Sequence, residues 1–175
     1  MEEMKQKPDY LFEVSWEVCN KVGGIHTVIA TKALTVGKQM GDNYVVIGPD
    51  LMHEQSNPEF KADDTLFTAW RENLYAEGIR VRIGRWNIAG SPIAILIDFK
   101  SMISQKDEVL KHLWEDYHVD SISGQWDYVE PVLFGYLAGK VIESYVDNFC
   151  ATTEKAVAHF HEWMTCSGGL YLRKH

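Results

Sequence analysis

The sequence changes its hydrophobic period across one short segment, and this change limits what the chain can fold into. Residues 10 to 16 are rich in aromatic and β-branched side chains, which favour a strand. From Ile25 to Ala33 apolar residues recur at helical spacing instead. The segment Lys21-Val22-Gly23-Gly24 lies between the two patterns. The sequence therefore predicts a strand, a loop and a helix that begins directly after the glycine pair.

The start of this helix has the parts of an anion site. A helix N-terminus offers unpaired backbone N–H groups and the positive end of the helix dipole. The missing Cβ atoms of Gly23 and Gly24 allow close approach, and Lys21 adds a positive charge. The spacing is neither the dinucleotide fingerprint nor a P-loop, because both need further glycines. It indicates a phosphate or diphosphate site, although an ordinary tight turn beside a solvated lysine has the same spacing.

Composition excludes several partners. The net charge of −8 disfavours nonspecific binding to nucleic acid or to anionic membranes, because both depend on a cationic surface. No apolar run approaches the ~18 residues that a membrane span needs. Residues 1 to 8 are of mixed charge without an apolar core, so they do not form a signal peptide. We expect a cytoplasmic protein.

The three cysteines, Cys19, Cys150 and Cys166, show no paired short spacing. This argues against a disulfide framework and against a zinc knuckle, and predicts reduced, packed thiols.

Strand and helix patterns alternate along the rest of the chain. We expect strands at 43–49, 78–84, 92–98 and 156–160, a polar loop at 50–64, and helices at 101–118, at 127–145 and from 162–163 onward. Alternation of this kind predicts an α/β fold, a Rossmann-like, mostly parallel sheet with flanking helices. Ligands of such sheets bind beyond the carboxyl ends of the strands. Lys21 to Gly24 and the segment after residue 160 both follow strands, so both should lie at that edge.

A second cluster, His159-Phe160-His161-Glu162-Trp163, allows three interpretations. A zinc site is disfavoured, because Phe160 would point to the opposite face from the histidines and spacing supplies no third or fourth ligand. One imidazole at the strand end could instead hydrogen-bond a sugar hydroxyl or the reacting group. The third interpretation, a packed histidine satisfied by the backbone, is expected for one of the two.

Other polar residues are expected to be structural. Glu13 is interpreted as a cap or surface residue, and Arg85 as the partner of an acidic neighbour. Asp127 is expected to cap the helix that follows it, with Pro131 near the first turn. Glu17 could bind sugar hydroxyls, or be a cap or surface residue.

Five blocks of sequence, in order, resemble the eukaryotic-type glycogen synthases. They are Phe12-Glu13-Val14-Ser15-Trp16-Glu17-Val18 with Asn20-Lys21-Val22-Gly23-Gly24-Ile25, Gly41-Asp42-Asn43-Tyr44 with Gly48-Pro49, Gly84-Arg85-Trp86, Val132-Leu133-Phe134-Gly135-Tyr136-Leu137, and Val157-Ala158-His159-Phe160-His161-Glu162-Trp163. The resemblance implies two Rossmann-like domains facing a cleft (a GT-B fold) and transfer of glucose from UDP-glucose to a glucan acceptor. It also implies retention of anomeric configuration, and neither a metal ion nor another cofactor.

The same resemblance assigns roles to individual residues. His161 would be the catalytic residue at the glucose end of the cleft, with His159 as second choice. Lys21 would contact the UDP moiety, Gly23 and Gly24 would shape the donor loop, and Glu162 would bind substrate. The sequence departs from the family at His26, where a tyrosine is more common, and at Glu130-Pro131.

Residues 1–175 resemble most of the amino-terminal domain of such an enzyme. In the family, the acidic catalytic residue and the basic residues on the diphosphate belong to the carboxy-terminal domain, and we expect all of them to lie beyond His175. We therefore expect this chain to be inactive alone. One alternative is a stand-alone nucleotide-sugar or glucan-binding module or a truncated remnant without catalysis. Another is an oligomerisation or regulatory domain. An open half-cleft should expose apolar surface that a second copy or the other domain would cover.

Overall fold

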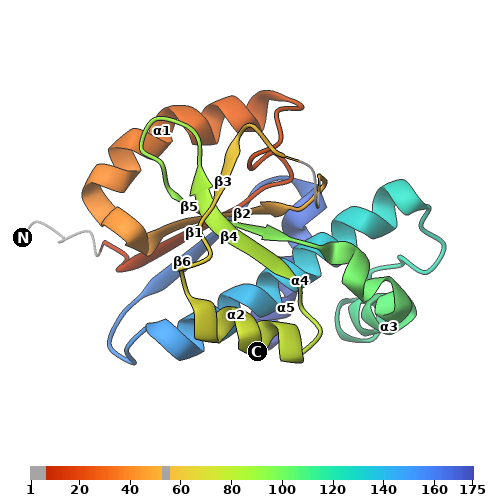
Figure 1. Cartoon of the computed structure of the whole chain (residues 1–175). Coiled ribbons are helices and arrows are strands. Elements are labelled where there is room, and N and C mark those ends of the chain that lie inside the picture. Colours follow the sequence, from red (N-terminus) through yellow and green to blue (C-terminus); the bar gives the residue numbers. More distant parts are fainter. Residues whose placement is uncertain (1–6, 53–55) are drawn as a thin grey trace, which may run out of the picture.

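The computed structural model describes residues 7–52 and 56–175. Within them the chain has an α/β fold, one mixed β-sheet with helices on both faces (Figure 1). The described sheet has six strands in the order β3-β4-β5-β2-β1-β6. The strands are β1 (Tyr10–Val14), β2 (Tyr44–Pro49), β3 (Phe60–Ala62), β4 (Val81–Trp86), β5 (Ile93–Ile97) and β6 (Ala156–Phe160). The predicted fold class is confirmed.

Helices cover both faces of this sheet. The α-helices are α1 (Gly24–Met40), α2 (Thr68–Ala76), α3 (Lys106–Tyr117), α4 (Trp126–Phe149) and α5 (Cys166–Lys174), and the short 3-10 helices are η1 (Gly41–Asn43), η2 (Phe99–Gln105) and η3 (Trp163–Thr165). Figure 1 shows α1 on one face and α2, α4 and α5 on the other. Ile29 and Ala33 of α1 share a core cluster with Val46, whereas the α4 side chains pack with Val45 and Ile47. Alternate β2 residues therefore enter opposite cores, as the pleat of a strand requires.

The sheet is parallel at its centre and antiparallel at one side. β1, β2, β5 and β6 run parallel, while β4 is antiparallel to both β5 and β3. The strand expected at 78–84 lies at Val81–Trp86, and β3 lies within the stretch expected to be a loop. The link from Trp86 to Ile93 is too short for the crossover that a parallel pair needs, which is why β4 turns back on β5.

Helix α4 forms the centre of the larger core, and its start differs from the expectation. The helix begins at Trp126 with Gln125 as N-cap, so Asp127 lies in the first turn and does not cap the helix. Pro131 lies inside the helix, where it removes one backbone hydrogen bond. The predicted helix at 127–145 extends to Phe149. In the described residues, no helix is both long and apolar enough to span a bilayer.

Glycine allows α5 to approach α4 at backbone distance. A Cβ atom on Gly168 would lie 2.4 Å from the carbonyl oxygen of Gly135, and one on Gly135 would lie 2.9 Å from the carbonyl oxygen of Thr165. The hydroxyl of Ser167 donates to the Val132 carbonyl oxygen at 2.7 Å. This contact fixes the segment that leads from β6 into α5.

Candidate functional site

The loop after β1 and the segment after β6 leave the same edge of the sheet. β1 and β6 are parallel neighbours in which Glu13 is opposite His159, and the N–H of His161 extends the ladder to the carbonyl oxygen of Val14 at 3.0 Å. The expectation that both segments lie at the carboxyl edge of the strands is therefore confirmed. Parallel sheets usually bind ligands at this edge.

The first helix begins at Gly24 with Gly23 as N-cap, one residue before the predicted start after the glycine pair, and its N-terminus is partly occupied. The N–H groups of Gly23 and His26 both donate to Oε2 of Glu17 at 2.9 Å. Glu17 is buried at this position. The expectation that these N–H groups are unpaired is wrong for Gly23 and His26, because the chain supplies its own carboxylate to the positive end of the helix dipole.

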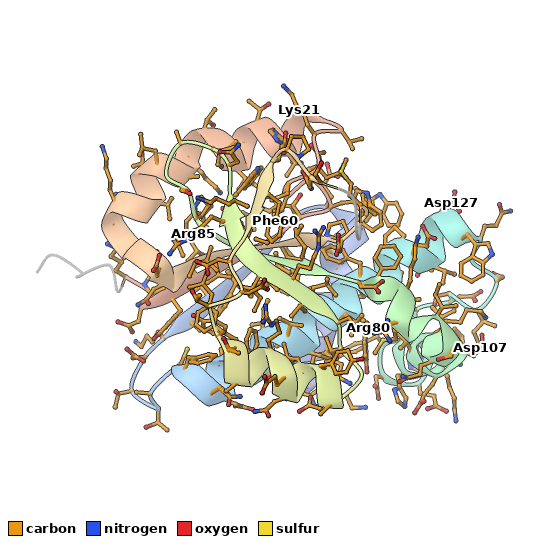
Figure 2. The ribbon with its side chains drawn as sticks, viewed as in Figure 1. Lys21, Phe60, Arg80, Arg85, Asp107 and Asp127 are labelled. Atoms are coloured by element: carbon orange, nitrogen blue, oxygen red, sulfur yellow. The ribbon has the colours of Figure 1, made fainter. Side chains whose placement is uncertain are left out.

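The two glycines have different surroundings. A Cβ atom on Gly23 would lie 2.8 Å from Oε1 of Glu17, so glycine at this position leaves room for the carboxylate. A Cβ atom on Gly24 would meet nothing within 4 Å. Lys21 is exposed, and Figure 2 shows it beside the start of α1. Lys21 and the open side of Gly24 are the part of the predicted anion site that the structure leaves accessible.

Glu13 lies at the centre of a buried polar cluster under α1. The Tyr44 hydroxyl donates to its Oε2, and the Lys32 ammonium and His161 Nε2 contact its Oε1, the latter at 3.2 Å. His159 Nδ1 lies 3.4 Å from the same oxygen. The interpretation of Glu13 as a cap or surface residue is wrong, because β1 is an interior strand and α1 covers the face to which position 13 points.

Hydrogen bonds keep the Glu13 carboxylate ionised. Burial alone would raise its pKa, but the donors His161, Lys32 and Tyr44 outweigh burial and lower the pKa to about 2. The pKa of the Tyr44 hydroxyl is raised, first by burial and then by its bond to this carboxylate. The Glu13 carboxylate is therefore negatively charged next to the two histidines at neutral pH.

The two histidines differ in exposure although their rings are close. The ring centroids lie 4.1 Å apart, yet the His161 side chain is 8% exposed and that of His159 is 54% exposed. Burial and the neighbouring His161 both lower the pKa of His159. Of the two candidates, His161 is thus held inside the cluster and His159 is the more accessible.

The tertiary structure places a third possible metal ligand, Glu13, beside the two histidines, which sequence spacing could not do. Ligand atoms of Glu13, His159 and His161 all lie within 4.8 Å of one another. The ammonium of Lys32 already contacts Oε1 of Glu13, so the cluster contains its own compensating cation. The absence of a required metal ion stays a prediction.

The segment after β6 turns sharply and exposes two side chains. Glu162 has φ of 62°, in the left-handed region that non-glycine residues seldom adopt, and its side chain is exposed. Trp163 is 55% exposed and its ring is parallel to that of Tyr128. The hydroxyl of Thr165 donates to the His161 carbonyl oxygen at 2.8 Å, which closes the turn.

Two further residues have structural partners. Arg85 bonds both oxygens of Asp42, at 2.6 and 3.0 Å, which confirms the expected acidic partner, and Figure 2 shows it away from Lys21. Nε2 of His26 lies 2.9 Å from a carboxylate oxygen of Glu59, and its ring packs edge-to-face with the ring of Trp86. All three cysteines are free, but only Cys19 is buried, so the expectation of packed thiols is wrong for the exposed Cys166.

Comparison with known proteins points to a single family. The family model described as glycogen synthase matches residues 13–175. The chain is 37% identical over 161 residues to the liver glycogen [starch] synthase of Rattus norvegicus, an alignment that covers 90% of this chain and 22% of that protein. It is 36% identical over 170 residues to the human liver protein, covering 96% of this chain and 24% of that protein. It is 37% identical over 169 residues to the glycogen [starch] synthase of Neurospora crassa, covering 90% and 22%. The chain thus spans less than a quarter of the length of these three relatives.

Proposed function

Because the chain belongs to the glycogen synthase family, we propose that it is the amino-terminal part of a glucosyltransferase. The enzyme would move glucose from UDP-glucose to a growing α-1,4-glucan with retention of configuration, in the cytoplasm. The observation that carries the proposal is the family match over residues 13–175, which includes both segments at the carboxyl edge of β1 and β6. The family relatives are named as glycogen synthases, and this name is the basis for the donor and acceptor classes.

The exposed half of the α1 start suits the phosphates of the donor. We propose that Lys21 contacts the diphosphate and that the open side of Gly24 lets it approach the backbone. Glu17 remains bound to the N–H groups of Gly23 and His26, so Gly23 acts by admitting Glu17 and not by touching the donor. Positive charge near the departing diphosphate stabilises the charge that develops there during transfer. In this proposal Lys21 contributes that charge from this domain, and no metal ion is needed.

The histidine segment suits the sugar end of the donor. His161 and the more exposed His159 would hydrogen-bond glucose hydroxyls, and the exposed Glu162 would bind substrate beside them. Imidazoles and carboxylates are ordinary partners for hydroxyl groups. The proposal thus divides the edge into a phosphate end at α1 and a sugar end at β6.

Binding of UDP-glucose tests this arrangement directly. Saturation-transfer NMR on the chain should show contact with UDP-glucose, and Lys21→Ala should reduce the signal strongly. Lys38→Ala is the matched control, because Lys38 is an exposed lysine in the last turn of the same helix. Equal binding by wild type and Lys21→Ala would contradict the role of Lys21, and no contact at all would contradict the phosphate end.

A further inference from the structure

We propose that Glu13 is a positioning residue that holds His161 with its proton on Nε2 and so leaves Nδ1 as the nitrogen that meets the sugar. This inference rests on the proposed function and deepens it by naming the atom.

The proton position follows from the partner of each nitrogen. His161 Nε2 lies 3.2 Å from Oε1 of Glu13, and the side chains are 8% and 1% exposed. An ionised carboxylate only accepts hydrogen bonds, so the nitrogen that faces it must carry the hydrogen. In a neutral imidazole the other nitrogen is then an acceptor. When the His161 ring is neutral, its acceptor is therefore Nδ1.

Glu13 is held well enough to act as the fixed partner. Lys32 of α1 and Tyr44 of β2 donate to the same carboxylate, so two elements besides its own strand hold it in place. The backbone of His161 is fixed as well, because its N–H bonds Val14 and its carbonyl oxygen accepts from Thr165. With backbone and ring both held, His161 keeps one orientation before substrate arrives.

His159 lacks this control. Its Nδ1 lies 3.4 Å from Oε1 of Glu13, a longer contact, and more than half of its side chain is in solvent. The proposal therefore assigns a fixed tautomer to His161 alone. His159 and His161 would therefore differ in whether the nitrogen that accepts a hydrogen bond from a hydroxyl is fixed.

Because Nδ1 accepts hydrogen bonds, it favours the glucose end of UDP-glucose over the diphosphate end. Nδ1 of neutral His161 accepts a hydrogen bond from a hydroxyl, which donates, but offers nothing to a phosphate oxygen, which only accepts. Glu13 would thus help to assign the hydroxyl-bearing sugar to β6 while the phosphates remain with Lys21.

Nitrogen NMR of the ring detects the tautomer without any substrate. In the ¹⁵N-labelled chain, a long-range ¹H–¹⁵N spectrum should show His161 with a protonated Nε2, an unprotonated Nδ1, and an Nε2 proton slow enough in exchange to be seen. His161→Asn assigns the signal by removing it, and His159→Asn should leave it in place. A His161 ring protonated on Nδ1 instead would overturn the proposal.

The link to Glu13 is tested by substitution. In Glu13→Gln the charged acceptor is lost, so the Nε2 proton should shift upfield and exchange faster with water. Glu59→Gln is the matched control, because Glu59 faces His26 and should leave the His161 signal unchanged. An unchanged His161 signal in folded Glu13→Gln would overturn the role of Glu13.

The NMR results can be interpreted separately from misfolding of a variant and from failure of the proposed function. If Glu13→Gln does not fold, the wild-type spectrum still decides the tautomer. If the chain fails to bind UDP-glucose, the proposed function loses support, whereas the tautomer measured without ligand stands or falls by itself.

Discussion

At the scale of single residues, two glutamates of the first strand and the loop after it are buried acceptors for several donors, which their sequence positions do not suggest. Glu13 is the buried acceptor for Lys32, Tyr44 and His161, and Glu17 is the acceptor for two N–H groups at the start of α1. Both carboxylates are inside the protein, where loss of the charge leaves their donors without a partner. We therefore expect the loss of either carboxylate to lower the free energy of unfolding.

The first prediction concerns acid stability. The pKa of Glu13 falls from its ordinary 4.5 to about 2 on folding, so its contribution is present above pH 4.5 and is lost as the pH falls toward 2. A shift of this size corresponds to about 3 kcal/mol. Wild type and Glu13→Gln should therefore differ in free energy of unfolding by about that amount at pH 7, and the difference should shrink between pH 4.5 and pH 2.

Urea unfolding of both proteins at several pH values checks this. Glu72→Gln, a change at an exposed glutamate of α2, serves as the control and should unfold like wild type at each pH. A gap between wild type and Glu13→Gln that is as large at pH 3 as at pH 7 would contradict the assignment of the charge.

The second prediction concerns Glu17. Glu17→Ala removes the acceptor of the Gly23 and His26 N–H groups, so the free energy of unfolding should fall by about 1–2 kcal/mol, as for the loss of a helix cap. Thermal unfolding followed by circular dichroism measures the loss. Glu72→Ala removes an exposed carboxylate without these bonds and should change stability by less than about 0.5 kcal/mol. Equal stability of the two variants would mean that Glu17 does not hold the helix start.

At the scale of elements, the contact between α4 and α5 determines where the histidine segment lies. The segment passes from β6 through η3 into α5, and α5 is held against α4 by the close approach of Gly168 to Gly135. A methyl group there has no space, because the nearest atom is backbone and cannot rotate away.

The third prediction compares neighbouring glycines of α5. Gly168→Ala should lower the free energy of unfolding by about 1–3 kcal/mol through overpacking against Gly135. Gly169→Ala should be neutral or stabilising by up to ~1 kcal/mol, because its Cβ would lie 3.6 Å from Phe160 and alanine favours a helix. Denaturant unfolding of both variants measures the difference. If both changed stability alike, the helix contact would not depend on the missing Cβ atom of Gly168.

At the scale of the whole molecule, the carboxyl edge of the sheet exposes apolar side chains that a partner could cover. The loop after β1 exposes Val22, which is 73% accessible, and the segment after β6 exposes Trp163. The phosphate and sugar ends of the proposed site lie in these same two segments. The resemblance described under Sequence analysis implies that the acidic catalytic residue and the basic residues on the diphosphate belong to a carboxy-terminal domain.

The fourth prediction follows for activity. The 175-residue chain, incubated with radiolabelled UDP-glucose and glycogen, should transfer no glucose above background, because the groups proposed to complete the site are outside it. A full-length relative such as the rat liver enzyme is the positive control. Turnover by the chain comparable to that of the relative would contradict the division of the site between two domains. Binding of UDP-glucose without turnover would be common to the proposed function and to a stand-alone binding module, and the mass of the protein made by its own cells separates these two.

The sequence alone determined the local order of the chain. Its change of period placed the start of the first helix to within one residue of Gly24, its apolar runs identified β2 and β5, and the motifs of residues 12–25 and 157–163 indicated the family. These features depend on residues that are close in sequence, where spacing reports burial directly. The structure alone decided the Glu13 cluster, whose partners Tyr44 and His161 are 31 and 148 residues away from it. It also decided that Glu17 fills part of the helix start and that β4 runs antiparallel. Hydrophobic period tells which side of an element is covered, but which distant charge lies opposite a buried carboxylate depends on the pairing of strands, and that pairing exists only in the folded chain.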